Sequence, residues 1–234
     1  MCINLLKNMI LSSVILLTGF AVRASEVGED KRELETESRV SFQYGPKLNL
    51  RLSTLTPYES GNKSLNAKPG FGIGAGFFGR ALLTEKWFLA SSVNFNYDAM
   101  NLIMKSNYGI GLIPDWEKYD LDIFSMEIPL HVGFRFPISD EMHYSVYSGV
   151  SGTFLLAAKV NGPHDSGRFD AFGYEGILKR NSFNVDIGIN IELDNHALID
   201  IGGKFGCLNQ ENRHVFGFNH MYYMNASIDV VFFL

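Results

Sequence analysis

The sequence predicts an all-β fold, an eight-stranded antiparallel up-and-down transmembrane β-barrel. Three observations predict it. After residue 40, apolar and polar residues alternate one by one, which is the period of a β-strand. The connections between the predicted strands are alternately long and short. The polar face of these strands carries few charges and many glycines, which suits the narrow interior of a barrel better than a surface in water.

Composition excludes several other classes of protein. The chain has 234 residues, of which 46% are hydrophobic and 19% charged, with 2 cysteines and a net charge of −5. Abundant bulky apolar residues exclude disorder over most of the chain, and two cysteines are too few for a disulfide scaffold. A negative net charge argues against nucleic acid as a partner.

Residues 1–24 are expected to be a signal peptide. Lys7 precedes a short apolar run that falls below the roughly 20 residues of a spanning helix. Val22 and Ala24 are small enough for signal peptidase, so cleavage is predicted before Ser25. A retained membrane anchor is the alternative.

Residues 25–39 are rich in charge and poor in apolar side chains, which predicts a flexible periplasmic segment; a short helix is the alternative. Removal of Cys2 with the signal peptide leaves Cys207 without a partner in the chain. The barrel domain is predicted to cover 40–234.

Each strand is predicted from its alternation. The clearest cases are 121–136, 183–193 and 222–234, in which every second residue is apolar. Several strands are longer than the roughly 5–6 residues that are usual for strands of soluble proteins. They reach the length of about 9–11 residues that a tilted transmembrane strand needs. The same pattern predicts five further strands at 40–53, 70–80, 87–98, 142–158 and 197–208.

The connections fit an outer-membrane barrel, with extended external loops, tight periplasmic turns and both ends of the chain on the periplasmic side. The predicted long segments are 54–69, 99–120, 159–180 and 209–219. The predicted short segments are 81–86, 137–141 and 194–196.

Alternation alone leaves open which face points outward, because a soluble barrel alternates with its apolar side chains inside. The polar face favours a membrane barrel, with a soluble barrel as the alternative. Its small residues are Gly45, Gly72, Gly74, Gly76, Gly149, Gly188, Gly202 and Gly206. Its charges balance, which predicts an internal ion-pair network, since isolated buried charges are costly. These charges are Lys47, Arg51, Arg80, Arg135 and Lys204 against Glu127, Asp186, Glu192, Asp200 and Asp229.

Aromatic residues near the strand ends are expected to form the interfacial girdles of a membrane barrel, although each could be an ordinary strand former. They are Trp87, Tyr97, Phe136, Tyr144, Tyr222 and Phe232.

A three-residue turn at 194–196 sets the register of the strands beside it. Leu193 then opposes Ala197, and Asp186 opposes Lys204 inside the barrel, with Asp200 and Glu192 nearer the turn. A β-bulge that shifts the register is the alternative.

Four segments resemble the PorT-type outer-membrane β-barrel family. They are GPKLNLRLSTL (45–55), KPGFGIGAGFFGRALLTEKWFL (68–89), SMEIPLHVGFRF (125–136) and YSGVSGTFLLAAKV (147–160). The resemblance covers about 40–234. It implies a small eight-stranded barrel of a Gram-negative outer membrane, and the family's founder implies an accessory role in protein secretion. Outer-membrane barrels often end on an aromatic residue, whereas this chain ends Phe233-Leu234.

Candidate chemical sites are weak. His164, Asp165 and Ser166 are adjacent residues in a turn and cannot form a nucleophile–base–orienter chain. His131 and His143 fall on the lumen face without the spacing of metal ligands, which predicts hydrogen-bonding histidines.

Two further features carry no site. His214 and His220 are expected in solvent beside the fourth long loop. The spacing of the glycines in 71–79 is similar to that of a phosphate-binding motif, but these glycines lie inside a predicted strand. The limited space in a narrow lumen explains them better.

Aromatic residues in the long loops suit either binding or ordinary loop packing. They are Tyr108, Trp116, Tyr119, Phe169, Phe172 and Tyr174. The sequence therefore predicts a monomeric, non-enzymatic barrel with a filled lumen, no cofactor and no metal, and a structural or loop-mediated binding or adhesion role. Its expected partners are outer-membrane lipid, the barrel-assembly machinery and an extracellular ligand or protein. A rim enzyme acting on lipid or peptide, a secretion component and a small-solute pore are the alternatives.

Overall fold

The computed structural model describes residues 40–58, 65–106, 115–139, 142–161, 168–172, 178–193, 196–210 and 220–234. The predicted signal peptide and the segment 25–39 lie outside these ranges. Within them, no helix is long and apolar enough to cross a membrane. The strands are β1 (Ser41–Tyr58), β2 (Leu65–Leu82), β3 (Trp87–Ser106), β4 (Asp115–Pro137), β5 (Met142–Asn161), β6 (Arg168–Asp170), β7 (Asn181–Leu193), β8 (Ala197–Gly206) and β9 (His220–Phe232).

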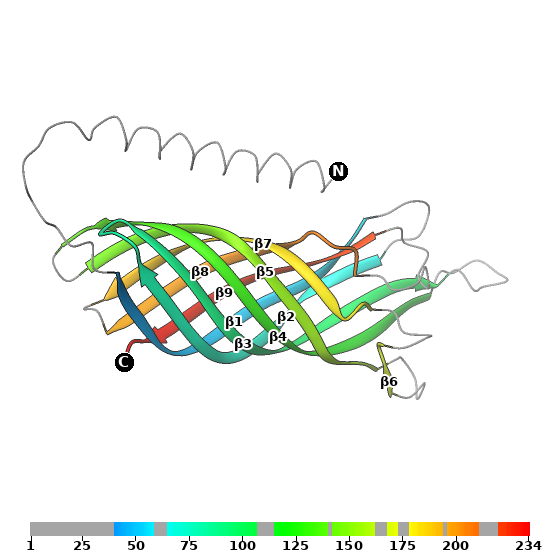
Figure 1. Cartoon of the computed structure of the whole chain (residues 1–234). Coiled ribbons are helices and arrows are strands. Elements are labelled where there is room, and N and C mark those ends of the chain that lie inside the picture. Colours follow the sequence, from blue (N-terminus) through cyan, green and yellow to red (C-terminus); the bar gives the residue numbers. More distant parts are fainter. Residues whose placement is uncertain are drawn as a thin grey trace, which may run out of the picture. The chain divides into compact units, whose positions relative to one another are not determined.

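Eight of the strands close into a ring (Figure 1). Each pairs antiparallel with its neighbours in the order β1, β2, β3, β4, β5, β7, β8, β9, and β9 returns to β1. The short β6 pairs only with β5, at its loop end. The prediction of an eight-stranded antiparallel up-and-down barrel is confirmed.

The strands extend farther toward the long loops than the sequence pattern predicted. The ladder of β3 and β4 continues to Ser106 and Asp115, inside the predicted loop 99–120. Likewise β1 and β2 reach Tyr58 and Leu65, inside the predicted loop 54–69. The short connections at 83–86, 138–141 and 194–196 agree with the prediction.

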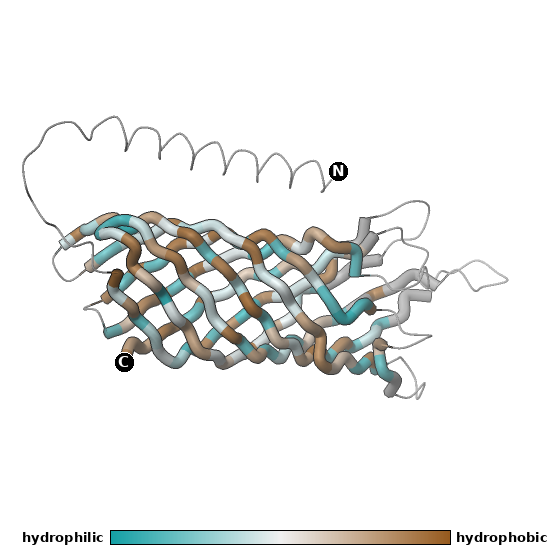
Figure 2. Tube along the Cα trace, viewed as in Figure 1, coloured by the Kyte–Doolittle hydropathy of each residue, from teal (hydrophilic) through white to brown (hydrophobic). Residues whose placement is uncertain are grey.

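Polarity inverts along the strands, which explains this difference. In β4, the side chains of Phe124, Ile128 and Leu130 point outward, as a membrane-facing band requires. Nearer the loops, the outward residues are Lys118 and Asp120, with side chains 62% and 54% exposed. The apolar residues there point inward, so a search for outward apolar residues stops while the hydrogen-bonded ladder continues. Figure 2 shows the alternation of apolar and polar residues along the strands.

Two register shifts lie near this change of polarity. One falls between Lys68 and Phe71 in β2, and the other between Phe124 and Ser125 in β4. In the second, β5 carries an extra residue, Leu156, which no residue of β4 opposes. Such bulges bend and twist a strand locally, so they suit the place where a barrel changes its surroundings.

The lumen contains three layers. The loop end holds an apolar layer of Leu55, Met100, Leu121, Ile123, Leu155, Ala158, Val160, Ala171, Phe172, Leu178, Met221 and Tyr223, all buried. The turn end holds a second apolar layer of Phe78, Phe88, Ala90, Tyr147, Leu198 and Val231, beside which lie the buried charges of Arg80 and Glu192. Between them along the strands lies a central layer of buried polar and charged side chains.

Candidate functional site

The central layer is built around the predicted ion pairs. The Nζ atom of Lys204 contacts Glu127 Oε1 and lies 3.7 Å from Asp186 Oδ2. Arg51 lies 3.7 Å from Glu127 Oε2 through its Nη2 atom. Because all of these side chains are nearly inaccessible to solvent, their charges depend on one another for compensation.

The predicted register of β7 and β8 is confirmed. Leu193 opposes Ala197, and Asp186 opposes Lys204. The predicted Asp186–Lys204 contact exists inside the barrel, but Lys204 lies closer to Glu127, which comes from β4 across the lumen. Sequence counting along one hairpin could not find this partner.

The charged network also includes Asp98. The predicted balance of five cations and five carboxylates did not count this residue. It is fully buried in β3, 3.4 Å from the Nε atom of Arg51 and 2.8 Å from the hydroxyl of Tyr223. The predicted strand ended at this residue, although its even number already placed it on the lumen face. The lumen therefore holds an excess of carboxylates over Lys and Arg among the described residues.

The histidine on the lumen face of β4 makes the hydrogen bond expected of it. His131 Nε2 lies 3.0 Å from Asp186 Oδ2. Its ring stacks on that of Tyr147, with ring centres 4.3 Å apart, and the Tyr147 hydroxyl donates to Asp200 at 2.8 Å. No group of three or more His, Cys, Asp or Glu residues in the described ranges is arranged to hold a metal.

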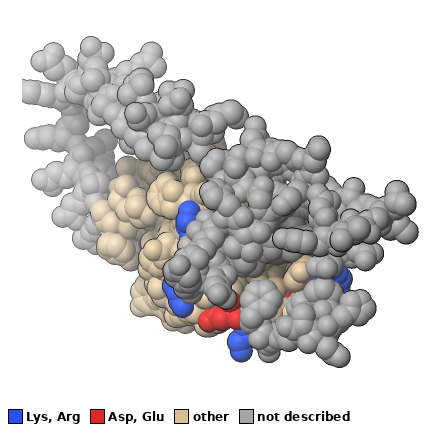
Figure 3. Space-filling view, turned by 90° about the vertical axis from the view of Figure 1, so that its right-hand side faces the viewer, with Lys and Arg blue, Asp and Glu red and all other residues tan. Residues whose placement is uncertain are grey.

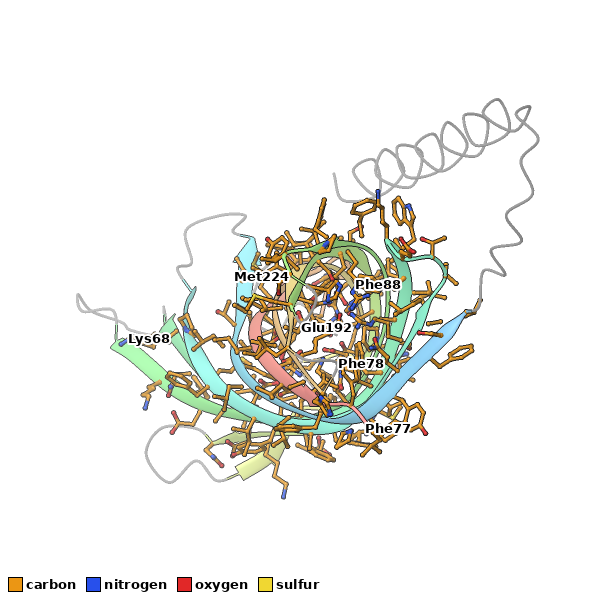
Figure 4. The ribbon with its side chains drawn as sticks, turned by 90° about the vertical axis from the view of Figure 1, so that its left-hand side faces the viewer. Lys68, Phe77, Phe78, Phe88, Glu192 and Met224 are labelled. Atoms are coloured by element: carbon orange, nitrogen blue, oxygen red, sulfur yellow. The ribbon has the colours of Figure 1, made fainter. Side chains whose placement is uncertain are left out.

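A second charged group lies nearer the turns, around Glu192. Arg80 and Arg135 each contact this carboxylate, at 2.8 Å and 2.7 Å. The guanidinium of Arg80 also stacks over Phe88 and Phe233, at 5.3 Å and 5.4 Å from the ring centres. Figure 4, seen from the turn end, shows Glu192 and Phe88 inside the ring of strands. Phe233, the penultimate residue, thus packs into the base of the lumen.

The glycines of β2 make room for the polar side chains of β3. A Cβ atom on Gly72 would collide with Asp98, and one on Gly76 would lie 2.5 Å from Asn94 Oδ1. On Gly74 it would lie 2.6 Å from Asn49 Oδ1. The interpretation of these glycines as a response to lumen crowding is supported, and none of them belongs to a strand–turn–helix motif.

The connection between β5 and β7 enters the loop end of the barrel. Ala171, Phe172 and Leu178 are buried in the loop-end apolar layer. Arg180 holds its guanidinium 4.4 Å from the centre of the Phe172 ring. Lys179 N donates to the carbonyl of Gln210, which ties this connection to the segment after β8. Of the predicted loop aromatics, Phe172 and Tyr119 therefore serve packing.

The outer rim beside the loops is polar. Its exposed basic residues are Lys68, Lys118, Lys159, Lys179 and Arg180, and its exposed acidic residues include Asp120 and Asp170. Figure 3, the view onto this end, shows basic side chains at several separate places rather than as one patch. Lys118 and Asp120 form an ion pair at 3.1 Å.

The predicted girdle aromatics lie on the outer face. Trp87 packs edge-on against Phe134, with ring centres 5.1 Å apart, and Phe136 follows at 4.7 Å from Phe134. Tyr144 extends this row, with its ring 6.4 Å from that of Phe136. The row lies at the turn end, where an aromatic girdle of a membrane barrel is expected.

The structure describes only some of the other predicted site residues. His143 is partly buried at the turn end of β5, where it opposes Glu192. His164, Asp165, Ser166 and His214 lie outside the described residues, as do Tyr108, Tyr174 and the side chains of Trp116, Phe169 and His220. The described residues form a packed, ion-paired interior.

Several solved structures and one family model are similar to this chain. The chain is similar in fold to Ail, the attachment invasion locus protein of Yersinia pestis (10% identity, 82% of this chain and 99% of that chain covered, TM-score 0.41). It is also similar to Neisserial surface protein A (11%, 82% and 97%, 0.43) and to OprG from Pseudomonas aeruginosa (10%, 86% and 97%, 0.43). The curated proteins gave no match. The model of the outer membrane protein beta-barrel domain matches residues 31–223, so the chain is an outer-membrane protein that belongs to this family.

Proposed function

We propose that this barrel is a monomeric, non-enzymatic outer-membrane protein that does not conduct solutes and that presents its loop end as a binding or adhesion surface. One observation carries the proposal: beyond the apolar band, the hydrogen-bonded ladder of β4 and β5 continues with polar side chains outside and packed apolar side chains inside. The outward residues are Lys118, Asp120 and Lys159, and the inward ones are Leu121, Ala158 and Val160. A segment built in this way projects its loops from the membrane on a rigid support.

The filled lumen supports the non-conducting part of the proposal. An eight-stranded barrel encloses only enough space for side chains, and here two apolar layers flank the charged one. The rings of Phe88 and Phe172 are buried, one in each of the two apolar layers. The non-enzymatic part rests on the character of the interior, where Asp98, Glu127, Asp186, Glu192 and Asp229 lie beside cations and Asp200 accepts a hydrogen bond from Tyr147.

We also propose that the chain is of the PorT type within its family. The strand segments 68–89 and 125–136 support this, because the resemblance lies in the residue pattern of the strands. A role in secretion does not follow, since one barrel fold serves several functions.

Photocrosslinking in intact cells tests the binding role. A photoreactive residue would replace Lys118 or Lys159, exposed on the outer face near the loops, and as a matched control Thr84, exposed in the turn between β2 and β3. We expect a discrete crosslinked product from the loop-end positions that is missing from the Thr84 variant. Equal yields from both ends, or none from the loop end, would contradict the proposal.

A further inference from the structure

The central layer of the lumen encloses a small polar cavity. The volume of this cavity is about 10 Å³. That is close to the minimum that one water molecule needs. Its lining comes from β1, β3, β4, β8 and β9, so it lies at the middle of the barrel, between the two apolar layers.

Five oxygen atoms of the lining residues are buried without a hydrogen-bond partner. They are the amide oxygens of Asn49, Asn94 and Asn225 and one carboxylate oxygen each of Glu127 and Asp229. Each of these side chains belongs to a residue at most 7% exposed.

The amide nitrogens of Asn49 and Asn225 are already engaged. Asn49 Nδ2 donates to Asn96 Oδ1 at 3.0 Å, and Asn225 Nδ2 donates to Ser53 Oγ at 3.0 Å. The oxygens are therefore the atoms left for the cavity. One water molecule can donate only two hydrogens, whereas a cation accepts oxygen ligands on all sides.

The charges of the central layer point the same way. Three cations, Lys47, Arg51 and Lys204, face five carboxylates, Asp98, Glu127, Asp186, Asp200 and Asp229, among the described residues.

The group around Glu192 adds two cations and one carboxylate, so the described lumen residues hold five Lys and Arg side chains against six carboxylates. One negative charge therefore stays uncompensated while His131 is neutral and all the carboxylates are ionised. Within the described ranges, Asp200 accepts hydrogen bonds from Tyr147 and, when the amide nitrogen of Asn190 faces it, from Asn190. Burial of uncompensated charge is costly, which favours an added cation.

We propose that the central lumen binds one monovalent, oxygen-coordinated cation of the sodium class. The amide oxygens of Asn49, Asn94 and Asn225 are its neutral ligands, and Glu127 and Asp229 supply the charge. High-affinity divalent sites gather more carboxylates than the two that line this cavity. Arg51 and Lys204 also border the cavity, and their repulsion disfavours a doubly charged ion.

The binding test compares two chloride salts. The full-length mature protein is refolded in detergent with sodium or with N-methylglucamine, a cation too large for the cavity, at equal ionic strength. In the concentration range above the dissociation constant, each tenfold rise in sodium should raise the thermal midpoint by about 3–5 °C. Equal midpoints in the two salts would mean that the cavity holds water only and would overturn the proposal.

A pair of variants localises the effect. Asn225→Leu removes one proposed ligand and should abolish the sodium dependence of the midpoint. Asn184→Leu is the matched control, because Asn184 is an equally buried lumen residue whose amide donates to Thr153 at 3.0 Å and does not line the cavity. It should keep the sodium dependence whatever its own stability. Loss of the dependence in both variants would contradict the site.

A direct measurement needs no variant. Wild-type protein refolded with radioactive ²²Na⁺ and then desalted rapidly should retain about one ion per barrel. Retention no greater than that of a denatured sample would overturn the proposal, even if the variants fail to fold.

Discussion

The hydroxyl of Tyr147 on β5 donates a 2.8 Å hydrogen bond over β7 to the carboxylate of Asp200 on β8. The bond depends on two residues without side chains. A Cβ atom on Gly202 would lie 2.6 Å from the Tyr147 hydroxyl, and one on Gly188 would lie 2.5 Å from the ring carbon that bears it. One large side chain and two glycines thus fill this level of the barrel together.

We expect Gly202→Ala to destabilise the barrel by about 1–3 kcal/mol, because it overpacks a filled interior. In the Tyr147→Phe background the same change should cost less, since the other neighbours of the Cβ lie at 3.6 Å and 3.8 Å. Urea unfolding of the two single variants and the double variant measures this coupling.

Gly203→Ala is the matched control for that experiment. The neighbouring glycine faces outward, and its nearest neighbour would be a carbon of Phe205 at 3.8 Å. We expect a change within about 0.5 kcal/mol, as is usual away from packed features. A cost for Gly203→Ala equal to that of Gly202→Ala would show that crowding by Tyr147 is not the cause.

Glu192→Gln removes the carboxylate that compensates two arginines. Arg80 is only 2% exposed, so its charge would stay buried without its ion-pair partner. Breaking a buried ion pair such as Arg80–Glu192 costs about 3–5 kcal/mol of stability. The Arg135–Glu192 pair contributes less, because solvent reaches Arg135. The free energy of unfolding in detergent measures the loss, with Glu85→Gln in an exposed turn as a control. A loss under about 1 kcal/mol would contradict the prediction and would mean that the ion pairs of Glu192 contribute little to stability.

Reconstituted protein should show no steady conductance in a planar bilayer. The reason is steric, because buried side chains of both apolar layers occupy the lumen. Single-channel recording at both polarities measures it, with an established large porin as the positive control. Long-lived, uniform current steps would contradict the filled lumen.

The membrane-facing part of the fold could be predicted from the sequence because one rule operates there. Along β7, and along β8 beyond Leu198, apolar residues point out and small or polar residues point in, so counting in twos gave the register of Asp186 and Lys204. The loop-end extension follows the opposite rule, with Leu121 inside and Asp120 outside, and the count ended too early.

Contacts across the lumen were beyond the sequence for a different reason. The partner of Lys204 on β4 depends on the diameter and twist of the closed ring, which no local pattern contains. The entry of Phe172 into the loop end likewise depends on how a long connection folds back. By contrast, Asp98 carried a readable signal, since it continues the lumen face of its strand.

The same geometry predicts an order among the contacts of Lys204. Its ammonium group touches Glu127 but lies 3.7 Å from Asp186, which also holds His131 and Ser151. In double-mutant cycles with Lys204→Met, we therefore expect Glu127→Gln to show the larger coupling, by about 1 kcal/mol or more. Asp186 keeps other partners when Lys204 is lost, whereas among the described residues Glu127 keeps weaker contacts, with Asn94 Nδ2 at 3.5 Å and Arg51 Nη2 at 3.7 Å. Free energies of unfolding for the single and double variants give both couplings. A larger coupling for Asp186→Asn would show that the pair within the hairpin, rather than the contact across the lumen, dominates the network.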